Sequence, residues 1–282
     1  MTGHGAATTG RAAGRTGHGG SGVDLEQEVS VARAAAAAAG EGIARLASGA
    51  RESWDKAEDS PVTLADLEAN RRILDTLREA FPDDAILSEE TADVRSRLSA
   101  ERVWIVDPLD GTKEFIAGIP EFAVSIALAL RGEPVVGVVL QPLTRECFFA
   151  AQGRGAWLGE ERLRVSPLAV LADCQVLSSR SEMKRGQLDP YESWFREIRP
   201  VGSVALKLAL IAAGRGDLWI SAAPKSEWDV CAGDLLVREA GGRFETLAEG
   251  PRRYNQAQVL LQPMMLAGSP ALLQAFRERA DS

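Results

Sequence analysis

The sequence predicts a layered α/β fold, and three features of the chain indicate it. Residues 24–48 and 63–82 carry apolar side chains at helical spacing, whereas 85–87 and 103–106 are short runs of β-favouring residues. Similar alternation continues to the C-terminus. The 282 residues, 45% of them hydrophobic, are enough to bury a large core. Helices and strands that alternate in this way favour layers in which helices cover sheets.

The composition narrows the classes of protein that the chain can represent. A net charge of −8 disfavours nonspecific binding to nucleic acid or to anionic membranes. Cys147, Cys174 and Cys231 are widely spaced and are expected to be reduced thiols. No apolar run approaches the length of about 20 residues that spans a bilayer, and the N-terminus lacks the apolar core of a secretion signal. We therefore expect a cytoplasmic protein without a membrane span.

The first 22 residues are expected to be a disordered extension. They are rich in Gly, Ala, Thr and Ser and offer little to bury. His4 and His18 lie in this segment, and the chain has only these two histidines. A hydrolase that needs an imidazole base within its folded domain is therefore unfavoured.

Two helices are predicted at the start of the folded part. Residues 24–48 are alanine-rich and helical in composition. Thr63 is a good N-cap for the second helix, and Pro82 is expected to end it. Asp66 lies in the first turn, where an acidic side chain interacts favourably with the helix dipole. Capping alone explains Asp66 from its spacing. The apolar positions expected on one face of this helix are Leu64, Leu67, Leu74, Leu77 and Phe81.

The stretch VWIVDPLDGTKEFI, residues 103–116, predicts a metal site. Pro108 is expected to end a buried strand, Gly111 to allow a sharp turn, and Thr112 to cap the next element. Asp107 and Asp110 would then project from the end of that strand. Two carboxylates at ~4 Å repel by roughly 4 kcal/mol at an effective dielectric near 20. A hard cation, above all magnesium, relieves this repulsion; the alternative is an ordinary Asp-Pro turn.

Strands are expected at 122–130 and 135–140, joined by a turn around Gly132. Further short strands are expected near 147–150 and from Cys174 to about Ser181. Cys174 and Arg180 have the C-x5-R spacing of cysteine-dependent phosphatases. The residues between them include no glycine, so they do not predict a phosphate-cradling loop. The acids of DPLDGT are at i and i+3 and also do not match the D-x-D of aspartyl-phosphate enzymes.

Two helix starts in the second half are candidate sites. Gly202 and Ser203 open a helix and are expected to offer free backbone N–H groups to an anion. From its position alone, Lys207 is expected to be a solvated residue of that helix. Asp229 is expected to be the N-cap of a later helix, which Gly241 or Gly242 closes, before a last strand near 264–267 and a final helix.

The motif DPLDGT at 107–112 resembles the signature of the inositol monophosphatase-like family of magnesium-dependent, lithium-sensitive phosphatases. Its continuation KEF, 113–115, is more similar to the 3'(2'),5'-bisphosphate nucleotidase branch. The resemblance runs from about Val23 to the C-terminus. It recurs at PVTLAD (61–66), the Glu89–Glu90 pair, Ser179–Ser181, Gly202–Ser203 with Lys207, and the Trp-Asp-x-x-Ala of 228–232.

This resemblance implies an αβαβα sandwich and a set of site residues. Two or three magnesium ions would be held by Glu89, Asp107, the Leu109 carbonyl, Asp110 and Asp229. Asp66 and Thr112 would orient the attacking water, which Glu89 also contacts. Substrate contacts would come from Gly111, Thr112, Ser179, Arg180, Gly202, Ser203, Lys207 and Asp229.

The expected function is removal of the 3'-phosphate from adenosine 3',5'-bisphosphate, and from its sulfated relative, in sulfur metabolism. An inositol or fructose bisphosphate phosphatase would share every metal ligand. A regulatory role with protein or RNA partners and a plain nucleotide-binding module are alternatives of another class. We expect a half at 23–160 carrying most metal ligands, a half at 161–282 carrying substrate contacts and Asp229, no polymeric nucleic acid as partner, and a homodimer as one possible assembly.

Overall fold

The computed structural model describes residues 1–2, 24–47, 49, 53–57, 60–247 and 252–281. The extension expected at 1–22 therefore lies almost wholly outside the described residues. Within them, no helix combines the length and the apolar character needed to cross a membrane.

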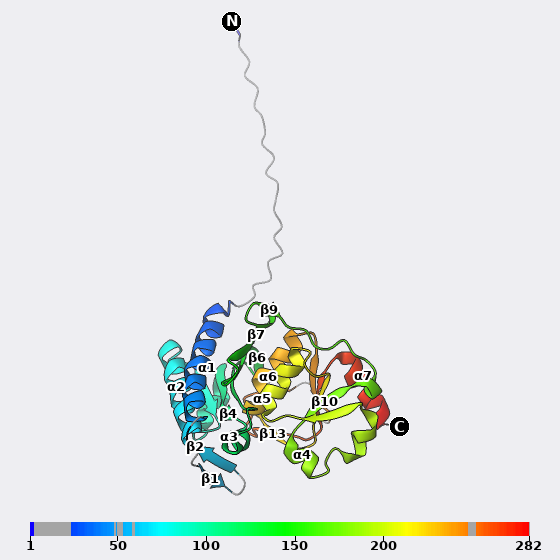
Figure 1. Cartoon of the computed structure of the whole chain (residues 1–282). Coiled ribbons are helices and arrows are strands. Elements are labelled where there is room, and N and C mark those ends of the chain that lie inside the picture. Colours follow the sequence, from blue (N-terminus) through cyan, green and yellow to red (C-terminus); the bar gives the residue numbers. More distant parts are fainter. Residues whose placement is uncertain (3–23, 48, 50–52, 58–59, 248–251, 282) are drawn as a thin grey trace.

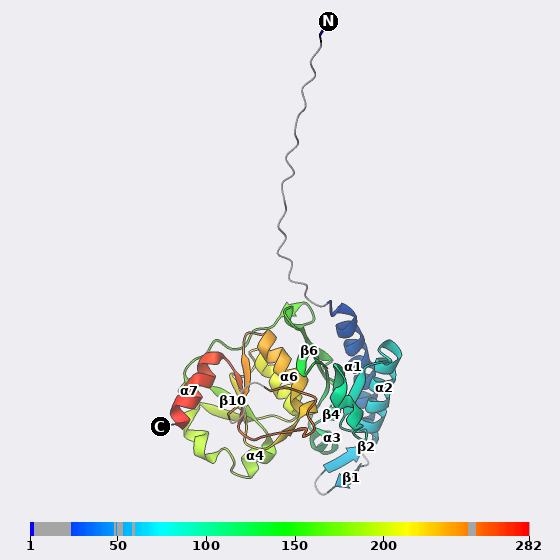
Figure 2. The same cartoon turned by 180° about the vertical axis from the view of Figure 1, so that it is seen from behind.

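The described chain forms five layers, seen edge-on in Figure 1 and from behind in Figure 2. Helices α1 (Glu26–Ala47) and α2 (Leu64–Ala80) cover the outer face of a seven-stranded sheet. Helices α5 (Val204–Ala212) and α6 (Glu227–Glu239) lie between this sheet and a five-stranded sheet, which α7 (Pro270–Ala280) covers on the far side. The αβαβα sandwich is therefore confirmed.

The larger sheet has the order β3-β4-β5-β6-β7-β8-β9 and the smaller one the order β11-β10-β12-β16-β14. Strands of the larger sheet are β3 (Ala85–Ser88), β4 (Arg102–Asp110), β5 (Ala123–Leu130), β6 (Glu133–Gln141), β7 (Glu146–Ala151), β8 (Gly155–Leu158) and β9 (Glu161–Arg162). Those of the smaller sheet are β10 (Gln175–Ser178), β11 (Glu197–Pro200), β12 (Leu218–Ser221), β14 (Arg243–Thr246) and β16 (Met265–Gly268). The division near residue 160 stays a prediction.

Shorter elements connect the layers. They are the paired strands β1 (Ser53–Ala57) and β2 (Ser60–Thr63), the paired strands β13 (Lys225–Ser226) and β15 (Leu260–Leu261), the helices α3 (Thr112–Ala117) and α4 (Arg180–Lys184), and the 3₁₀ turns η1 (Arg95–Ser99), η2 (Leu171–Asp173) and η3 (Asp189–Trp194).

Alternating side chains of each sheet enter different cores. In β4, Trp104 and Val106 pack toward α1 and α2, whereas Ile105 packs toward α5 and α6. In β12, Trp219 joins the same central core, and Ile220 packs toward α7. Because side chains alternate along each strand, one face of each sheet packs against the central helices. The residues at the ends of the strands therefore meet the ends of those helices.

The expectation that Pro108 ends the strand is wrong, because β4 continues to Asp110 through a β-bulge. Asp107 pairs with Ser125 and Asp110 with Ala123, so β4 advances three residues where β5 advances two. Residues at i and i+3 of a regular strand point to opposite faces. The one extra residue in the bulge shifts the alternation of side chains by one position, so both aspartates face the same side of the sheet.

The apolar face expected for α2 is also partly wrong. Leu74 and Leu77 are buried, but Leu64 is 55% exposed and Leu67 is 41% exposed. The inward positions of the first turns belong instead to Asp66 and Ala69. The capping box that Asp66 makes with Thr63 turns this carboxylate inward and sets the rotation of the helix.

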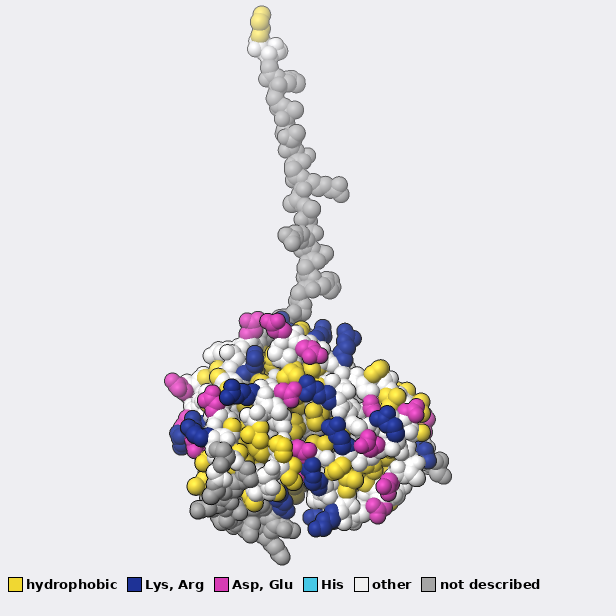
Figure 3. Space-filling model, viewed as in Figure 1, with side chains coloured by type: hydrophobic (Ala, Val, Ile, Leu, Met, Phe, Trp, Pro, Cys, Tyr) yellow, Lys and Arg dark blue, Asp and Glu magenta, His cyan; other side chains and the backbone are white. Residues whose placement is uncertain are grey.

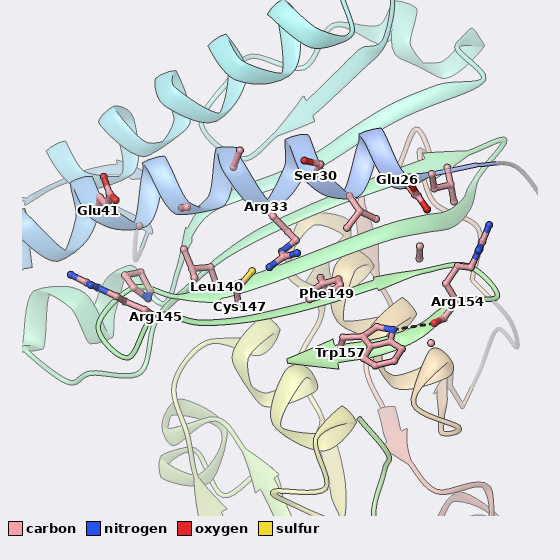
Figure 4. Close-up of a pocket in the computed structure, with 18 of the residues that line it drawn as sticks. Glu26, Ser30, Arg33, Glu41, Leu140, Arg145, Cys147, Phe149, Arg154 and Trp157 are labelled. Carbon is pink, nitrogen blue, oxygen red and sulfur yellow. Dashed lines mark hydrogen bonds between the residues drawn. The ribbon is translucent and has the colours of Figure 1, made fainter. Parts of the chain in front are cut away.

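Helix α1 leaves a groove of about 970 Å³ against strands β6 to β8 (Figure 4). Arg33 reaches into it and lies 4.2 Å from the ring centre of Phe149. None of the acidic residues described below lines this groove. On the face shown in Figure 3, acidic and basic side chains are interspersed.

Candidate active site

Three aspartates from separate elements form a compact acidic cluster. Asp107 and Asp110 lie on either side of the bulge in β4, and Asp229 lies in the first turn of α6. One ligand oxygen from each lies within 4.8 Å of the others. The bulge and the packing of α6 behind β4 and β5 therefore gather the carboxylates as the sequence analysis expected.

One oxygen of each carboxylate is held by the protein. Asp107 Oδ1 accepts from the N–H of Leu109 at 3.0 Å, and Asp229 Oδ2 accepts from the N–H of Ser226 at 2.8 Å. Asp110 Oδ2 accepts from the Ser203 hydroxyl at 2.7 Å and from the N–H of Ala205 at 2.6 Å. These bonds fix the orientation of the cluster and leave the second oxygen of each aspartate for a cation.

The prediction of a free anion site at Gly202 and Ser203, at the start of α5, is wrong. Ser203 is the N-cap, but the first turn of the helix already binds the carboxylate of Asp110. The N–H of Gly202 donates to Glu121 Oε2 at 2.7 Å. The positive end of α5 thus stabilises a side chain of the protein itself.

Asp229 is not the N-cap of α6, because the helix begins three residues earlier than this role requires. Ser226 is the N-cap, and Asp229 occupies the third helical position in a capping box. The same carboxylate therefore caps the helix and contributes to the acidic cluster. Gly241, with φ of +86°, follows the helix as expected.

Glu89 follows β3, which pairs in parallel with β4. Its N–H donates to the Val106 carbonyl at 3.2 Å, one residue before Asp107. The Glu89 carboxylate is close enough to raise the pKa of both Asp107 and Asp229. Its role as a metal ligand stays a prediction, as does that of the Leu109 carbonyl.

The electrostatics of the cluster match a cation site. Burial is the largest cause that raises the pKa of Asp107 well above its ordinary value, and Glu89, Asp110 and Asp229 add to it. Burial and the same crowding raise the pKa of Asp229 to about 8. An all-oxygen, carboxylate donor set is the set that magnesium prefers. Bound there, magnesium would stabilise negative charge on a phosphate and lower the pKa of water.

This crowding predicts a pH-dependent stability in metal-free protein. The folded chain retains protons on Asp107 and Asp229 that the unfolded chain releases near pH 4. Their contribution to stability is therefore greatest at low pH and is lost as the pH rises toward about 8. We expect Mg²⁺ to raise the Tm more at pH 8.5 than at pH 6, measured by thermal unfolding. An equal rise at both pH values, or the same pH dependence in Asp229→Asn, would contradict this.

Asp66 and Thr112 form the expected pair beside the cluster. The Thr112 hydroxyl donates to Asp66 Oδ1 at 2.9 Å, while Asp66 Oδ2 accepts from the N–H of Thr63 at 2.7 Å. Burial is the largest influence on Asp66 and raises its pKa, although these hydrogen bonds oppose it. With its proton directed to Asp66, the Thr112 oxygen can accept a hydrogen bond from a water molecule.

Thr112 does not cap α3, contrary to expectation. Gly111, with φ of +100°, is the N-cap, and Thr112 is the first helical residue. A Cβ on Gly111 would lie 3.1 Å from the Glu121 carbonyl oxygen, so the turn requires glycine for both its conformation and its space. The tight turn frees the Thr112 hydroxyl for Asp66.

A cavity of about 340 Å³ opens beside Asp110. Among its lining residues are Gly111, Ser179, Gly202 and Ser203, which the sequence analysis assigned to substrate, and the cationic residues Lys113, Arg180 and Lys207. The structure thus brings six of the predicted substrate contacts to one place next to the acidic cluster, whereas Thr112 and Asp229 do not line this cavity. Their contact with substrate stays a prediction.

Lys207 is neither a solvated helix residue nor turned outward. It is 1% exposed, and its Nζ donates to the carbonyls of Val201 and Ser203 at 2.9 and 2.8 Å. Burial lowers its pKa to about 8, against the opposing effect of Asp110. Lys207 therefore holds the loop before α5 through these two hydrogen bonds, and it also lines the cavity.

The sequence analysis missed Glu121, which binds Arg180 and Gly202 at this cavity, and Glu182, which lies in the same short helix as Arg180. Glu182 is 1% exposed and accepts from Lys225 Nζ and Ser221 Oγ, each at 2.7 Å. Neither glutamate belongs to a motif. The only signal of Glu182 is its position two residues after Arg180, which is ordinary for a surface helix.

The cysteine mechanism finds no support in the structure. Cys174 is buried, and burial raises the pKa of its thiol to about 12. A thiol in this environment is protonated at neutral pH and is a poor nucleophile.

The five-layer sandwich and the oxygen-only acidic cluster beside a Thr–Asp pair define a class of metal-dependent phosphatases. The chain belongs to the inositol monophosphatase family, whose sequence model matches residues 24–279. It is 39% identical over 225 residues to the inositol-1-monophosphatase of Rhizobium meliloti, covering 77% of this chain and 81% of that protein.

Two further comparisons agree with this family. The chain is 34% identical over 266 residues to the Nus factor SuhB of Vibrio cholerae, covering 90% and 97% of the two chains. The crystal structure of the extragenic suppressor protein suhB from Bartonella henselae is similar with a TM-score of 0.78 at 32% identity, covering 89% and 96%.

Proposed function

We propose that this member of the phosphatase family removes the 3'-phosphate of adenosine 3',5'-bisphosphate, and of its sulfated relative, with magnesium as cofactor. The observation that carries the proposal is a set of three cationic residues in the cavity beside Asp110, which Glu114 also lines. Lys113, Arg180 and Lys207 line it together. A substrate with a second phosphate would place negative charge among these cations, whereas an inositol ring would offer only hydroxyl groups there.

The residues of the chain would divide the work as follows. Asp107, Asp110 and Asp229, with Glu89 and the Leu109 carbonyl, would hold two or three magnesium ions. Thr112 would orient the attacking water and take a proton from it, while the Thr112 proton passes to Asp66 through their 2.9 Å hydrogen bond. Gly111, Ser179 and Arg180 would fix the substrate so that its phosphate is in line with the water.

A second candidate is the hydrolysis of inositol monophosphate. It is favoured by the 39% identity to the inositol-1-monophosphatase of Rhizobium meliloti. A regulatory role is the candidate of another class, in view of the relatives called Nus factor SuhB. Both would leave the acidic cluster unchanged, so only the substrate cavity or an activity measurement separates them.

A phosphate-release screen tests the proposal. Purified protein is given adenosine 3',5'-bisphosphate, inositol 1-phosphate and fructose 1,6-bisphosphate, each with and without Mg²⁺ and Li⁺. We expect the highest kcat/KM with adenosine 3',5'-bisphosphate, no release after chelation of divalent ions, and inhibition by Li⁺. Faster release from inositol 1-phosphate would reject the nucleotidase and favour the second candidate. Absence of release from every substrate would favour the regulatory role.

A further inference from the structure

Glu121 joins three segments that are far apart in the sequence. It lies between α3 and β5, and its Oε2 accepts from the N–H of Gly202 in the loop before α5. The same oxygen lies 2.5 Å from Nη1 of Arg180 in α4, and Glu114 Oε1 lies 3.8 Å from that nitrogen. The ion pair with Arg180 lowers the pKa of Glu121 although burial opposes it, so the carboxylate is ionised at neutral pH. The two glutamates therefore hold one corner of the Arg180 guanidinium.

The remaining edge of that guanidinium lies open. No hydrogen bond or ion pair joins Nε or Nη2 of Arg180 to another part of the chain that the structure describes, and Arg180 lines the cavity beside Asp110. The Nε and Nη2 groups lie on one side of the planar guanidinium. That side can donate two parallel hydrogen bonds to a phosphate.

The loop that Glu121 holds packs closely against Glu114 and Glu121 at Gly202. A Cβ on Gly202 would lie 2.5 Å from Glu114 Cγ and 2.5 Å from the Glu121 carbonyl oxygen. From the other side, Lys207 Nζ holds the carbonyls of Val201 and Ser203. The loop and the guanidinium are thus fixed against each other through a single carboxylate.

We infer that Glu121 is a positioning residue that sets specificity for a second anionic group on the substrate: by clamping Nη1 of Arg180, it presents the Nε–Nη2 edge to that group. The inference rests on the proposed function, since only a substrate with a second phosphate uses this edge. Glu121 itself does not touch the reacting phosphate, which lies with the acidic cluster.

The test compares two substrates that differ only in the second phosphate. In Glu121→Gln, we expect the KM for adenosine 3',5'-bisphosphate to rise roughly tenfold, because the guanidinium loses the ion pair that orients it. The kcat is expected to change by less than about twofold, and the KM for adenosine 3'-monophosphate to stay the same, because the acidic cluster is untouched.

Glu146→Gln is the matched control. Glu146 pairs with Arg215 at 2.6 Å, at a similar exposure, and neither residue lines the cavity. Its KM values should equal those of the wild type. Arg180→Lys is a second variant that keeps the charge and removes the paired donors, and it should show the same selective loss. If Glu121 acts through Arg180, the double variant Glu121→Gln/Arg180→Lys should be no worse than Arg180→Lys alone.

Three outcomes would overturn the inference: equal KM changes for both substrates, unchanged KM values, or additive effects in the double variant. The proposed function fails separately, when the wild type hydrolyses inositol 1-phosphate but not adenosine 3',5'-bisphosphate. The readout is then the Ki of adenosine 3',5'-bisphosphate against inositol 1-phosphate hydrolysis. A Ki that rises in Glu121→Gln supports the positioning role, and an unchanged Ki rejects it.

Discussion

Asp110→Asn is expected to lower kcat at least about 1,000-fold, a loss of roughly 4 kcal/mol of transition-state stabilisation. The substitution removes one negative charge from the three carboxylates that lie within 4.8 Å of one another. It keeps an oxygen that can accept from the N–H of Ala205 and from the Ser203 hydroxyl, so the start of α5 should be retained. Steady-state phosphate release and Mg²⁺ titration measure the effect, and circular dichroism checks the fold.

Asp234→Asn is the control for this variant, because Asp234 is also buried and lies in α6 with Asp229. Its carboxylate binds the Tyr254 hydroxyl at 2.8 Å and Arg238 Nε at 2.9 Å, outside the acidic cluster. We expect this variant to be less stable but to keep its kcat. If Asp110→Asn retained activity, the cluster would not be the catalytic centre. A protein that acts only by binding a partner should still bind it as the Asn variant.

Thr112→Val is expected to lower kcat about 100-fold while changing KM and the Mg²⁺ requirement little. Valine keeps the shape of threonine but cannot accept from water or donate to Asp66, whose Oδ1 lies 2.9 Å from the hydroxyl. Positioned proton acceptors of this kind contribute roughly 10²- to 10⁴-fold. Asp66→Asn tests the same pair less cleanly, because Asp66 also belongs to the capping box at the start of α2.

The control for Thr112→Val is Thr76→Val, at a threonine in α2 whose hydroxyl donates to the Arg72 carbonyl at 2.9 Å. Its kcat should equal that of the wild type. A rise in KM with unchanged kcat in Thr112→Val would assign the hydroxyl to substrate binding. Pre-steady-state phosphate release shows whether the chemical step itself has slowed.

The sequence by itself determined the layered fold class and most of its elements. Apolar periodicity located α2, β4, β5 and β6 within a few residues, because burial imposes the period of a helix or a strand on the chain. Residues close together in the sequence were also sufficient to predict a local interaction, as in the helix cap formed by Thr63 and Asp66. The acids of the central motif pointed to a cation because two ionised carboxylates at this spacing repel each other.

Only the tertiary structure decided how these parts meet. The Asp110 carboxylate binds the start of α5 across 93 residues, and Glu121 binds Gly202 across 81. The β-bulge that turns Asp107 and Asp110 to one side arises from the pairing of β4 with β5. Local patterns report which residues are buried and which helix they cap, but contacts between distant segments depend on how the layers pack. For that reason the N–H groups expected to be free at the helix start of Gly202 and Ser203 are occupied, and the cavity beside Asp110 is lined by segments that are far apart in the sequence.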